Sequence, residues 1–366
     1  MQISQRSKEI IDSCRFCWMC RHICPIGNAT GQERNTSRAR ALSLSLVKRG
    51  AAELKGDIVD NLYECSLCGG CTQDCATGFD PVQFTKETRL AAALEGNMPK
   101  YVEKLIDNIE KSGNIYGEKE IADVLKKAIS DLPEKADTVL FIGKDGAYRT
   151  PDKAAKAVEL LKKAGVDFTV NKHEPNSGYD LDFLIGAADE TKKTMTATAD
   201  ALNKMGAKTI VCYDPADAKV FLREYKEYGI DLKADVVTFT SFVAKLIEDG
   251  KLSVKNSGAE FTFQDPALLA RDLEETDCAR AILASCGKNK EMLLFGKATM
   301  LAGNLIMNEY IPDVMRLVAL DRWANAAHIG AKVLVTASPA EYAMLKDTSD
   351  GSIELITIEE AVLKCL

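Results

Sequence analysis

Hydrophobic residues recur at helical spacing through the first third of the chain. Residues 3–12 predict a short helix, and residues 30–64 have the length of a helical hairpin, with good helix formers from Ser37 onward. A longer helical section is predicted over residues 99–132, where apolar side chains return every three or four positions. This part of the chain is therefore expected to be helical.

The pattern of apolar residues changes at residue 137. Residues 138–143 form a short apolar run that ends in glycine, and residues 166–170 form another, so both predict buried strands. Between them, residues 154–164 have the pattern of an amphipathic helix that stops at Gly165. Strands that alternate with helices in this way predict an α/β layer with a parallel sheet.

One sequence pattern occurs twice in the second half of the chain. The residues GAKTIV at 206–211 precede PAD at 215–217, and GAKVLV at 330–335 precedes PAE at 339–341. The two copies are 124 residues apart throughout. The repeat predicts two homologous α/β lobes.

The composition is that of a globular protein. The chain is 46% hydrophobic and 28% charged, and its 366 residues suffice for two or three domains. No apolar run approaches the roughly eighteen residues that cross a bilayer, and the polar residues 1–13 lack the apolar core of a signal peptide. We therefore expect a cytoplasmic chain without a membrane span of its own.

Eight of the twelve cysteines form two runs with the same C-x2-C-x2-C-x3-C spacing. Three thiolates two residues apart can bind one face of an iron–sulfur cube, and in two-cluster ferredoxins the fourth cysteine of each run ligates the other cluster. We therefore assign two [4Fe-4S] clusters. The first has as ligands Cys14, Cys17, Cys20 and Cys75. The second has as ligands Cys65, Cys68, Cys71 and Cys24.

Zinc and disulfides are the competing interpretations of these cysteines. A structural zinc site usually needs pairs of C-x2-C rather than runs of four, and the single His22 does not supply the missing ligands. Disulfides would need an exported chain. His22 lies inside the first run and is either a surface histidine or a donor to a cluster sulfur.

Positive charge is concentrated around the first cysteine run. Residues 1–56 contain ten Lys/Arg against four Asp/Glu, a net charge of +6 that leaves −13 for the remaining residues. A basic patch can indicate nucleic acid, but no nucleic-acid motif or aromatic platform accompanies it. We therefore expect no nucleic-acid partner, and instead tuning of anionic clusters or docking of an acidic redox partner.

A tandem-cubane module followed by two repeated α/β lobes resembles the cysteine-rich (CCG) domain iron–sulfur subunits. These occur in heterodisulfide reductases and in glycolate, lactate and glycerol-3-phosphate dehydrogenases, and the resemblance covers nearly the full chain. It implies an α + α/β fold with an alpha-helical ferredoxin domain over residues 1–98 and a helical linker over 99–136. Two degenerate CCG lobes follow, over residues 137–250 and 251–366.

The resemblance also shows which ligands are missing. Active members supply cluster-binding cysteines from a Gly-Cys or Asp-Pro-Cys turn, a Cys-Cys-Gly turn and a Cys-Pro-x-Cys turn in each lobe. No cysteine stands at those turns here. The residues present are Gly143-Lys144, Glu174–Gly178 and Asp214–Asp217 in the first lobe, and Asp265–Ala267, Leu294–Gly296 and Ser338–Glu341 in the second. We therefore expect no lobe cluster, since soft clusters need soft ligands.

The remaining polar and thiol groups of the lobes are expected to be structural. Free cysteines outside the two runs are usually small core hydrophobes. They are Cys212, Cys278, Cys286 and Cys365. The carboxylates of Asp214, Asp217 and Glu341 at the vacated turns are expected to be solvated, with a re-used pocket as the alternative.

The resemblance implies an electron-transfer subunit rather than a catalyst. Two [4Fe-4S] clusters would relay single electrons between an FAD-dependent dehydrogenase, with the FAD on that flavoprotein partner, and a ferredoxin or another iron–sulfur subunit. Whether the chain is itself an enzyme stays open. The alternatives are a stand-alone heterodisulfide-reductase-like or quinone-reducing enzyme, with substrate held near Lys144 between the lobes, and clusters that act only as structural staples.

Overall fold

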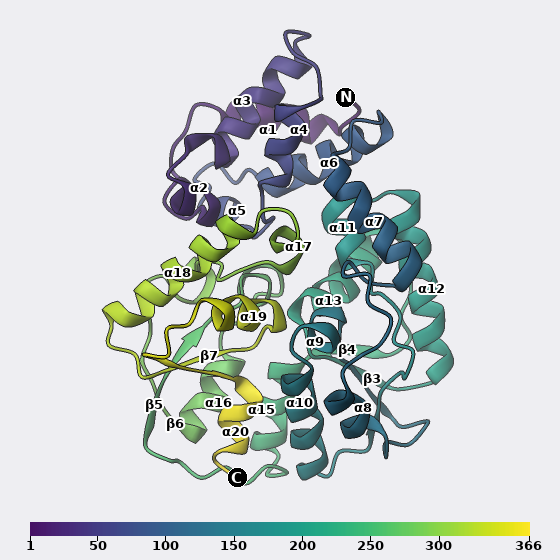
Figure 1. Ribbon diagram of the computed structural model, residues 1–366, viewed down its shortest axis with the longest axis vertical. Helices are drawn as coiled ribbons and strands as arrows, with labels where there is room; N and C mark the ends of the chain where they lie inside the picture. Colours follow the sequence, from purple (N-terminus) through teal and green to yellow (C-terminus); the bar gives the residue numbers. More distant parts are fainter.

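The computed structural model describes residues 1–366 as a helical part at one end and two α/β units side by side beneath it (Figure 1). The N-terminus lies at the helical end and the C-terminus at the opposite end. Helices and parallel sheets are thus combined as the sequence predicted.

The N-terminal part contains six α-helices and one 3-10 turn. They are α1 (Gln5–Cys14), α2 (Pro25–Thr30), η1 (Glu33–Asn35), α3 (Ser37–Lys48), α4 (Asp57–Tyr63), α5 (Gly70–Gln73) and α6 (Pro81–Leu94). The predicted first helix and helical hairpin are confirmed by α1, α3 and α4. The cap of α3 is Thr36, whose side chain accepts from the Ala39 N–H, so Ser37 is the first helical residue.

The predicted helical section over residues 99–132 is two helices rather than one. They are α7 (Lys100–Ser112) and α8 (Asp123–Ile129). Gly113 ends α7 with φ +74°, a left-handed conformation that glycine adopts at low cost. Asn114 then holds the following turn by donating to the carbonyls of Ser112 and Glu118. This turn was not visible in the periodic pattern.

The first parallel sheet has strand order β2-β1-β3-β4. Its strands are β1 (Thr138–Phe141), β2 (Phe168–Thr169), β3 (Thr209–Cys212) and β4 (Asp235–Thr238). The accompanying helices are α9 (Lys144–Tyr148), α10 (Pro151–Lys163), α11 (Tyr179–Ile185), α12 (Asp189–Met205), α13 (Pro215–Lys219), the π-helical turn η2 (Val220–Glu224), α14 (Tyr225–Glu227) and α15 (Phe239–Glu248). Both predicted strands, β1 and β2, are present.

The second parallel sheet has the corresponding order, β6-β5-β7-β8. Its strands are β5 (Ala259–Gln264), β6 (Gly287–Asn289), β7 (Val333–Thr336) and β8 (Glu354–Thr357). Its helices are the π-helical turn η3 (Leu268–Asp272), α16 (Cys278–Cys286), the 3-10 turn η4 (Gly296–Ala298), α17 (Leu305–Asn308), α18 (Pro312–His328), α19 (Pro339–Thr348) and α20 (Ile358–Leu363). The strands β3 and β7 are the repeated segments found in the sequence.

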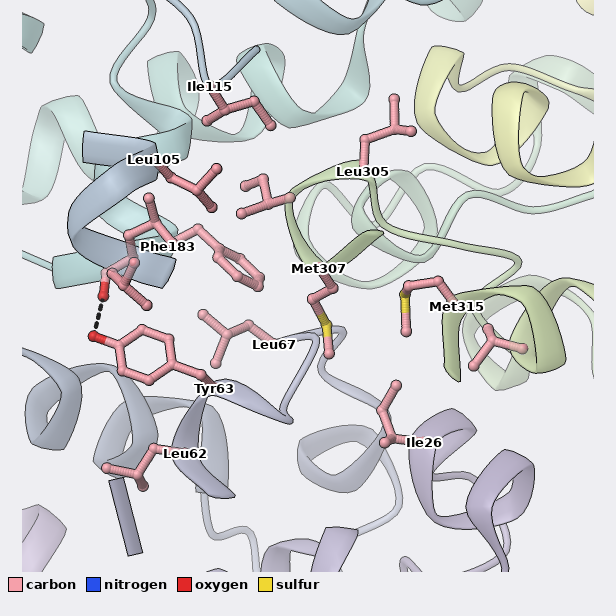
Figure 2. Close-up of a cluster of buried hydrophobic side chains, with 14 of the residues drawn as sticks. Ile26, Leu62, Tyr63, Leu67, Leu105, Ile115, Phe183, Leu305, Met307 and Met315 are labelled. Carbon is pink, nitrogen blue, oxygen red and sulfur yellow. Dashed lines mark hydrogen bonds between the residues drawn. The ribbon is translucent and has the colours of Figure 1, made fainter. Parts of the chain in front are cut away.

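Two large hydrophobic cores join these parts. One core packs α10, α15, α16 and α20 with strand residues of both sheets, including Val211 and Val335. The other connects the N-terminal helices to α7, α11, α17 and α18. Figure 2 shows Tyr63 and Leu67 of the N-terminal part beside Phe183 and Met307 in this second core. The cysteine runs therefore rest on both α/β units.

Candidate iron–sulfur site

The cysteines predicted for the first cluster lie around one small cavity. α1 ends at Cys14, and the following loop carries Cys17 and Cys20. Cys75, from the end of the second run, lies on the same cavity of about 70 Å³, which Phe79 also lines. The fold therefore brings the fourth cysteine of the second run to the first three cysteines of the first run.

The cysteines predicted for the second cluster also lie together. Burial raises the pKa of the Cys24 thiol to about 11, and nearby Cys68 and Cys65 add to the increase. Burial also raises the pKa of the Cys71 thiol, and nearby Cys65 and Cys68 raise it further. Cys71 also lines the first cavity, so the two groups of thiols are neighbours.

Local structure explains why the two runs approach each other so closely. Cys24 is the N-cap of α2, where its sulfur accepts from the Gly27 N–H at 3.4 Å and Pro25 occupies the first helical position. The second run passes directly beside this cap. A Cβ added at Gly70 would lie 3.3 Å from the carbonyl oxygen of Ile23, so glycine permits the contact.

The chemistry of this donor set fits iron–sulfur clusters. Burial raises the pKa of Cys14 to about 12, and the nearby Cys20 and Cys75 thiols raise it further. Crowded thiolates repel one another in a partly buried site, so a cationic core between them is needed to keep them ionised. The Phe79 N–H donates to the Cys75 sulfur at 3.2 Å, a contact that stabilises the charged form of a ligand sulfur.

The thiols of the two runs are not arranged around a single metal ion. Nowhere in the chain do three or more His, Cys, Asp or Glu side chains come close enough together to hold a single metal ion. The first four thiols instead surround a cavity. A cavity lined by cysteines is compatible with a [4Fe-4S] cluster, which four Cys thiolates hold.

Two buried arginines that we did not predict hold the second run in place. Arg89 donates to the carbonyl of Cys65 at 2.6 Å and to that of Leu62 at 2.8 Å. Arg40 donates to the carbonyls of Asn61 and Glu64, both at 2.9 Å. Neither arginine has a sequence signature, because each sits in an ordinary helical stretch.

His22 does not contact a cluster ligand. Its Nε2 lies 3.0 Å from a carboxylate oxygen of Asp74, and its side chain is 63% exposed. The surface interpretation of this histidine therefore holds, and a hydrogen bond from it to a sulfur is not formed. The contact with Asp74 joins the two runs, because Asp74 directly precedes Cys75.

The carboxylates at the vacated turns are buried, which corrects the prediction that they are solvated. Asp214, Asp217 and Glu341 are each less than a tenth exposed. Asp214 caps α13 by accepting from the Ala216 N–H at 2.9 Å. Burial raises the pKa of Glu341 to about 7, and burial and then Asp214 raise that of Asp217. The turns follow the carboxyl ends of the strands. They face the interior, because these ends of the two sheets lie towards each other and towards the N-terminal part.

Little space remains between the facing strand ends. One cavity of about 30 Å³ is lined by Asp214, Glu341 and Cys68, and another of about 10 Å³ by Lys144 and Asp217. Such volumes hold one or two water molecules. The substrate pocket that the stand-alone enzyme interpretation needs is not found at these turns.

A larger cavity, of about 610 Å³, lies elsewhere, beside the second cysteine run. Its lining includes cations that are paired inside the chain: Lys219 contacts Glu224 at 2.6 Å, and Arg223 contacts Asp272 at 3.1 Å. Arg271, also in the lining, donates to the Cys68 carbonyl at 2.7 Å. The second run is thus held by the second α/β unit as well.

The cysteines outside the two runs mostly behave as predicted. Cys212, Cys286 and Cys365 are buried, the first in one hydrophobic core and the other two together in another. Cys278 is partly exposed at the start of α16, so it is not a core residue. No helix in the structure combines the length and apolar character needed to cross a membrane.

Comparison with known proteins agrees with this geometry. The profile of the 4Fe-4S dicluster domain family matches residues 10–79, which contain both cysteine runs. The chain is 23% identical to one component of the dihydromethanophenazine:CoB--CoM heterodisulfide reductase of Methanosarcina mazei, over 96% of this chain and 92% of the relative. It is 24% identical to one component of the fumarate reductase (CoM/CoB) of Methanothermobacter marburgensis, over 70% of this chain and 52% of the relative.

Proposed function

We propose that this chain, an iron–sulfur homologue of a heterodisulfide reductase component, is an electron-transfer subunit of an oxidoreductase complex. It would relay single electrons between a flavoprotein and another carrier. The flavoprotein is an FAD-dependent dehydrogenase, and the FAD is bound there. The other carrier is a ferredoxin or a further iron–sulfur subunit. The bound clusters supply the chemistry, because each accepts and passes on one electron at a time.

The close approach of the two cysteine runs supports the proposal. Cys75 and Cys71 of the second run line one cavity with Cys14, Cys17 and Cys20, and Cys24 of the first run lies near Cys65 and Cys68. We assign the first [4Fe-4S] cluster to Cys14, Cys17, Cys20 and Cys75. We assign the second to Cys65, Cys68, Cys71 and Cys24. Two cubanes with exchanged ligands lie close together, as a relay of electrons requires.

The rest of the chain positions these ligands. We propose that residues 1–98 form the ferredoxin domain, residues 99–136 a helical linker, and residues 137–250 and 251–366 two lobes that no longer bind metal. The repeat at 124 residues and the matching strand orders support the division into lobes. Arg89 and Arg271 tie the second run to these lobes, which then serve as a platform against a partner protein.

The stand-alone reductase is the weaker candidate. Its substrate would have to reach the turns at Lys144, Asp214 and Glu341, where the cavities amount to about 10 and 30 Å³. The turns also lack the thiols that an active heterodisulfide reductase needs. An isolated chain that reduced a disulfide or a quinone with dithionite as donor would reverse this preference.

Single cysteine substitutions test the ligand assignment. Cys75→Ala is expected to remove the first cluster and Cys24→Ala the second, each with loss of about half of the iron. Cys278→Ala, outside both runs, is the matched control and should retain all of it. If Cys75→Ala and Cys24→Ala abolished the same spectroscopic signal, the crossed assignment would be wrong.

Co-expression with a candidate FAD-dependent dehydrogenase tests the subunit role. The two proteins are expected to elute together in gel filtration, and reduction of the flavin should be followed by one-electron reduction of the clusters. A chain with intact clusters that neither co-elutes with the flavoprotein nor exchanges electrons with it would contradict the proposal.

A further inference from the structure

The loop of the first cysteine run exposes an unusual amount of apolar surface. Phe16 is 74% exposed, Trp18 48% and Met19 56%. No other four consecutive residues of this chain expose three large hydrophobic side chains. Clustered apolar exposure of this kind costs solubility, and it commonly marks an interaction surface.

Arginines stack on both exposed aromatic rings. The guanidinium carbon of Arg38 lies 4.2 Å from the centre of the Trp18 ring, and that of Arg21 lies 5.4 Å from it. Arg15 lies 4.7 Å from the centre of the Phe16 ring. Such cation–π contacts hold the rings in place at the surface.

The surface continues along α3. Arg38, Leu42 and Leu46 are spaced four residues apart, so they share one face of the helix. Leu42 is 44% exposed and Leu46 is 38% exposed. Since Arg38 stacks on Trp18, the helix face adjoins the loop. We call these residues together the aromatic–arginine surface: Phe16, Trp18, Met19, Leu42 and Leu46 with Arg15, Arg21 and Arg38.

The charge of this surface selects for an acidic partner. Residues 1–56 have a net charge of +6, whereas the other residues of the chain have −13. Arg15 pairs with Asp12 at 3.5 Å and Arg38 pairs with Glu33, whereas Arg21 has no carboxylate partner in the chain, so the charge of Arg21 is available to a partner protein. An acidic protein is therefore attracted to this end of the molecule and repelled from the rest, and the attraction steers association.

The position of the surface points to electron exchange. Cys17 is exposed in the middle of the loop, between Phe16 and Trp18, whereas Cys68 of the second group is buried. Electron transfer slows steeply with distance, and this loop offers a protein a close approach to the first cluster. Aromatic residues and arginine are also the types enriched in protein interfaces.

We propose that the aromatic–arginine surface docks a small acidic protein that carries a one-electron centre. The inference deepens the proposed function, on which it rests, because it assigns the second carrier to the first cluster. A cluster held by Cys14, Cys17, Cys20 and Cys75 would exchange one electron with the carrier's centre, so that the side giving it up is oxidised, the other is reduced, and no bond is made or broken.

Titration with a plant-type [2Fe-2S] ferredoxin, an acidic one-electron protein, tests the proposal. The chain with both clusters is expected to bind it in isothermal titration calorimetry, and the affinity should fall at least about tenfold between low and high salt as charges are screened. The double variant Trp18→Ala/Arg21→Glu should weaken binding by about tenfold or more. Its iron content must equal that of the wild type.

Two further variants make the result specific. Leu42→Glu, on α3 and well separated in sequence from the cysteines, should weaken binding without any effect on cluster assembly. Val124→Ala/Lys127→Glu changes an equally exposed apolar–basic pair on α8, at the opposite end of the molecule (Figure 1), and should bind as the wild type does. Unchanged ferredoxin affinity in both surface variants would overturn the proposal.

Other occupants of the surface are tested in the same series. Tighter binding of a single-stranded oligonucleotide than of ferredoxin, or dimerisation of the free chain that the surface variants abolish, would also overturn it. Failure of this inference is distinguishable from failure of the proposed function. In the first case, the clusters still exchange electrons with the flavoprotein although ferredoxin does not bind; in the second, that exchange is itself absent.

Discussion

Replacing Arg89 with methionine should weaken the attachment of the second cysteine run to the first α/β unit. The arginine side chain is completely buried and donates four hydrogen bonds, all to main-chain carbonyls. The acceptors are the carbonyls of Leu62, Cys65 and Phe183. Leu62 lies in the last turn of α4 and Phe183 in the last turn of α11, where helix carbonyls lack intrahelical donors.

The cost can be estimated from these contacts. Three buried carbonyls lose their donor, at about 1–3 kcal/mol each, so the total loss is on the order of 5 kcal/mol. The negative ends of two helix dipoles also lose a cation. The buried Arg89 charge has no carboxylate partner, so its removal offsets part of this loss of stability. Unsatisfied acceptors outweigh the relief, and we expect a net loss of about 4 kcal/mol.

Thermal unfolding under nitrogen, followed by circular dichroism, measures this loss. For a chain of 366 residues, about 4 kcal/mol corresponds to a decrease in Tm of roughly 5 °C at a fixed scan rate. Because Arg89 holds the carbonyl of Cys65, the second cluster should also be lost first on exposure to air. The exposed Arg316→Met is the control, with a change of at most about 0.5 kcal/mol. A Tm of Arg89→Met within about 2 °C of the wild type would refute the reasoning.

Three further predictions concern the α/β units. Burial raises the folded-state pKa of Asp180 and Glu341 to about 7. The stability that these two groups contribute is therefore complete below pH about 4 and is lost as the pH rises through about 7. Asp180→Asn should flatten the Tm–pH curve in this range, and an unchanged slope would contradict this. Gly143 has φ +81° and packs against the Asp217 carboxylate. Gly143→Ala should therefore lower the free energy of unfolding, measured in urea, by about 2–3 kcal/mol. A neutral effect would be inconsistent with that contact. Arg271→Met should release the second cysteine run from the second sheet, with faster bleaching of the cluster absorbance in air; bleaching at the wild-type rate would count against this role.

Much of the fold was predictable because the decisive signals are local. The spacing within each cysteine run requires only short segments, and cysteines of both runs line one cavity in the structure. Strands such as β1 and β3 are short apolar runs between amphipathic helices, which sequence patterns identify well. The repeat that contains β3 and β7 likewise needed no tertiary information.

The parts that were missed depend on tertiary packing. Arg89 and Arg40 look like ordinary helix residues, and only the packed structure shows that they donate to carbonyls beside Cys65. Asp214 and Glu341 were expected in solvent, because turn carboxylates usually face it, whereas here the strand ends of both sheets face the interior. The exposure of Trp18 likewise depends on how the loop leaves the core.

The most direct test of the account is to count and characterise the clusters in protein purified without oxygen. Iron and sulfide analysis, with electron paramagnetic resonance after dithionite reduction, should give about eight irons and eight sulfides per chain and two magnetically interacting [4Fe-4S] signals. Replacing the eight cysteines of the two runs with alanine should abolish all of them. A single cluster in the wild type, or any cluster retained by the alanine variant, would contradict the account.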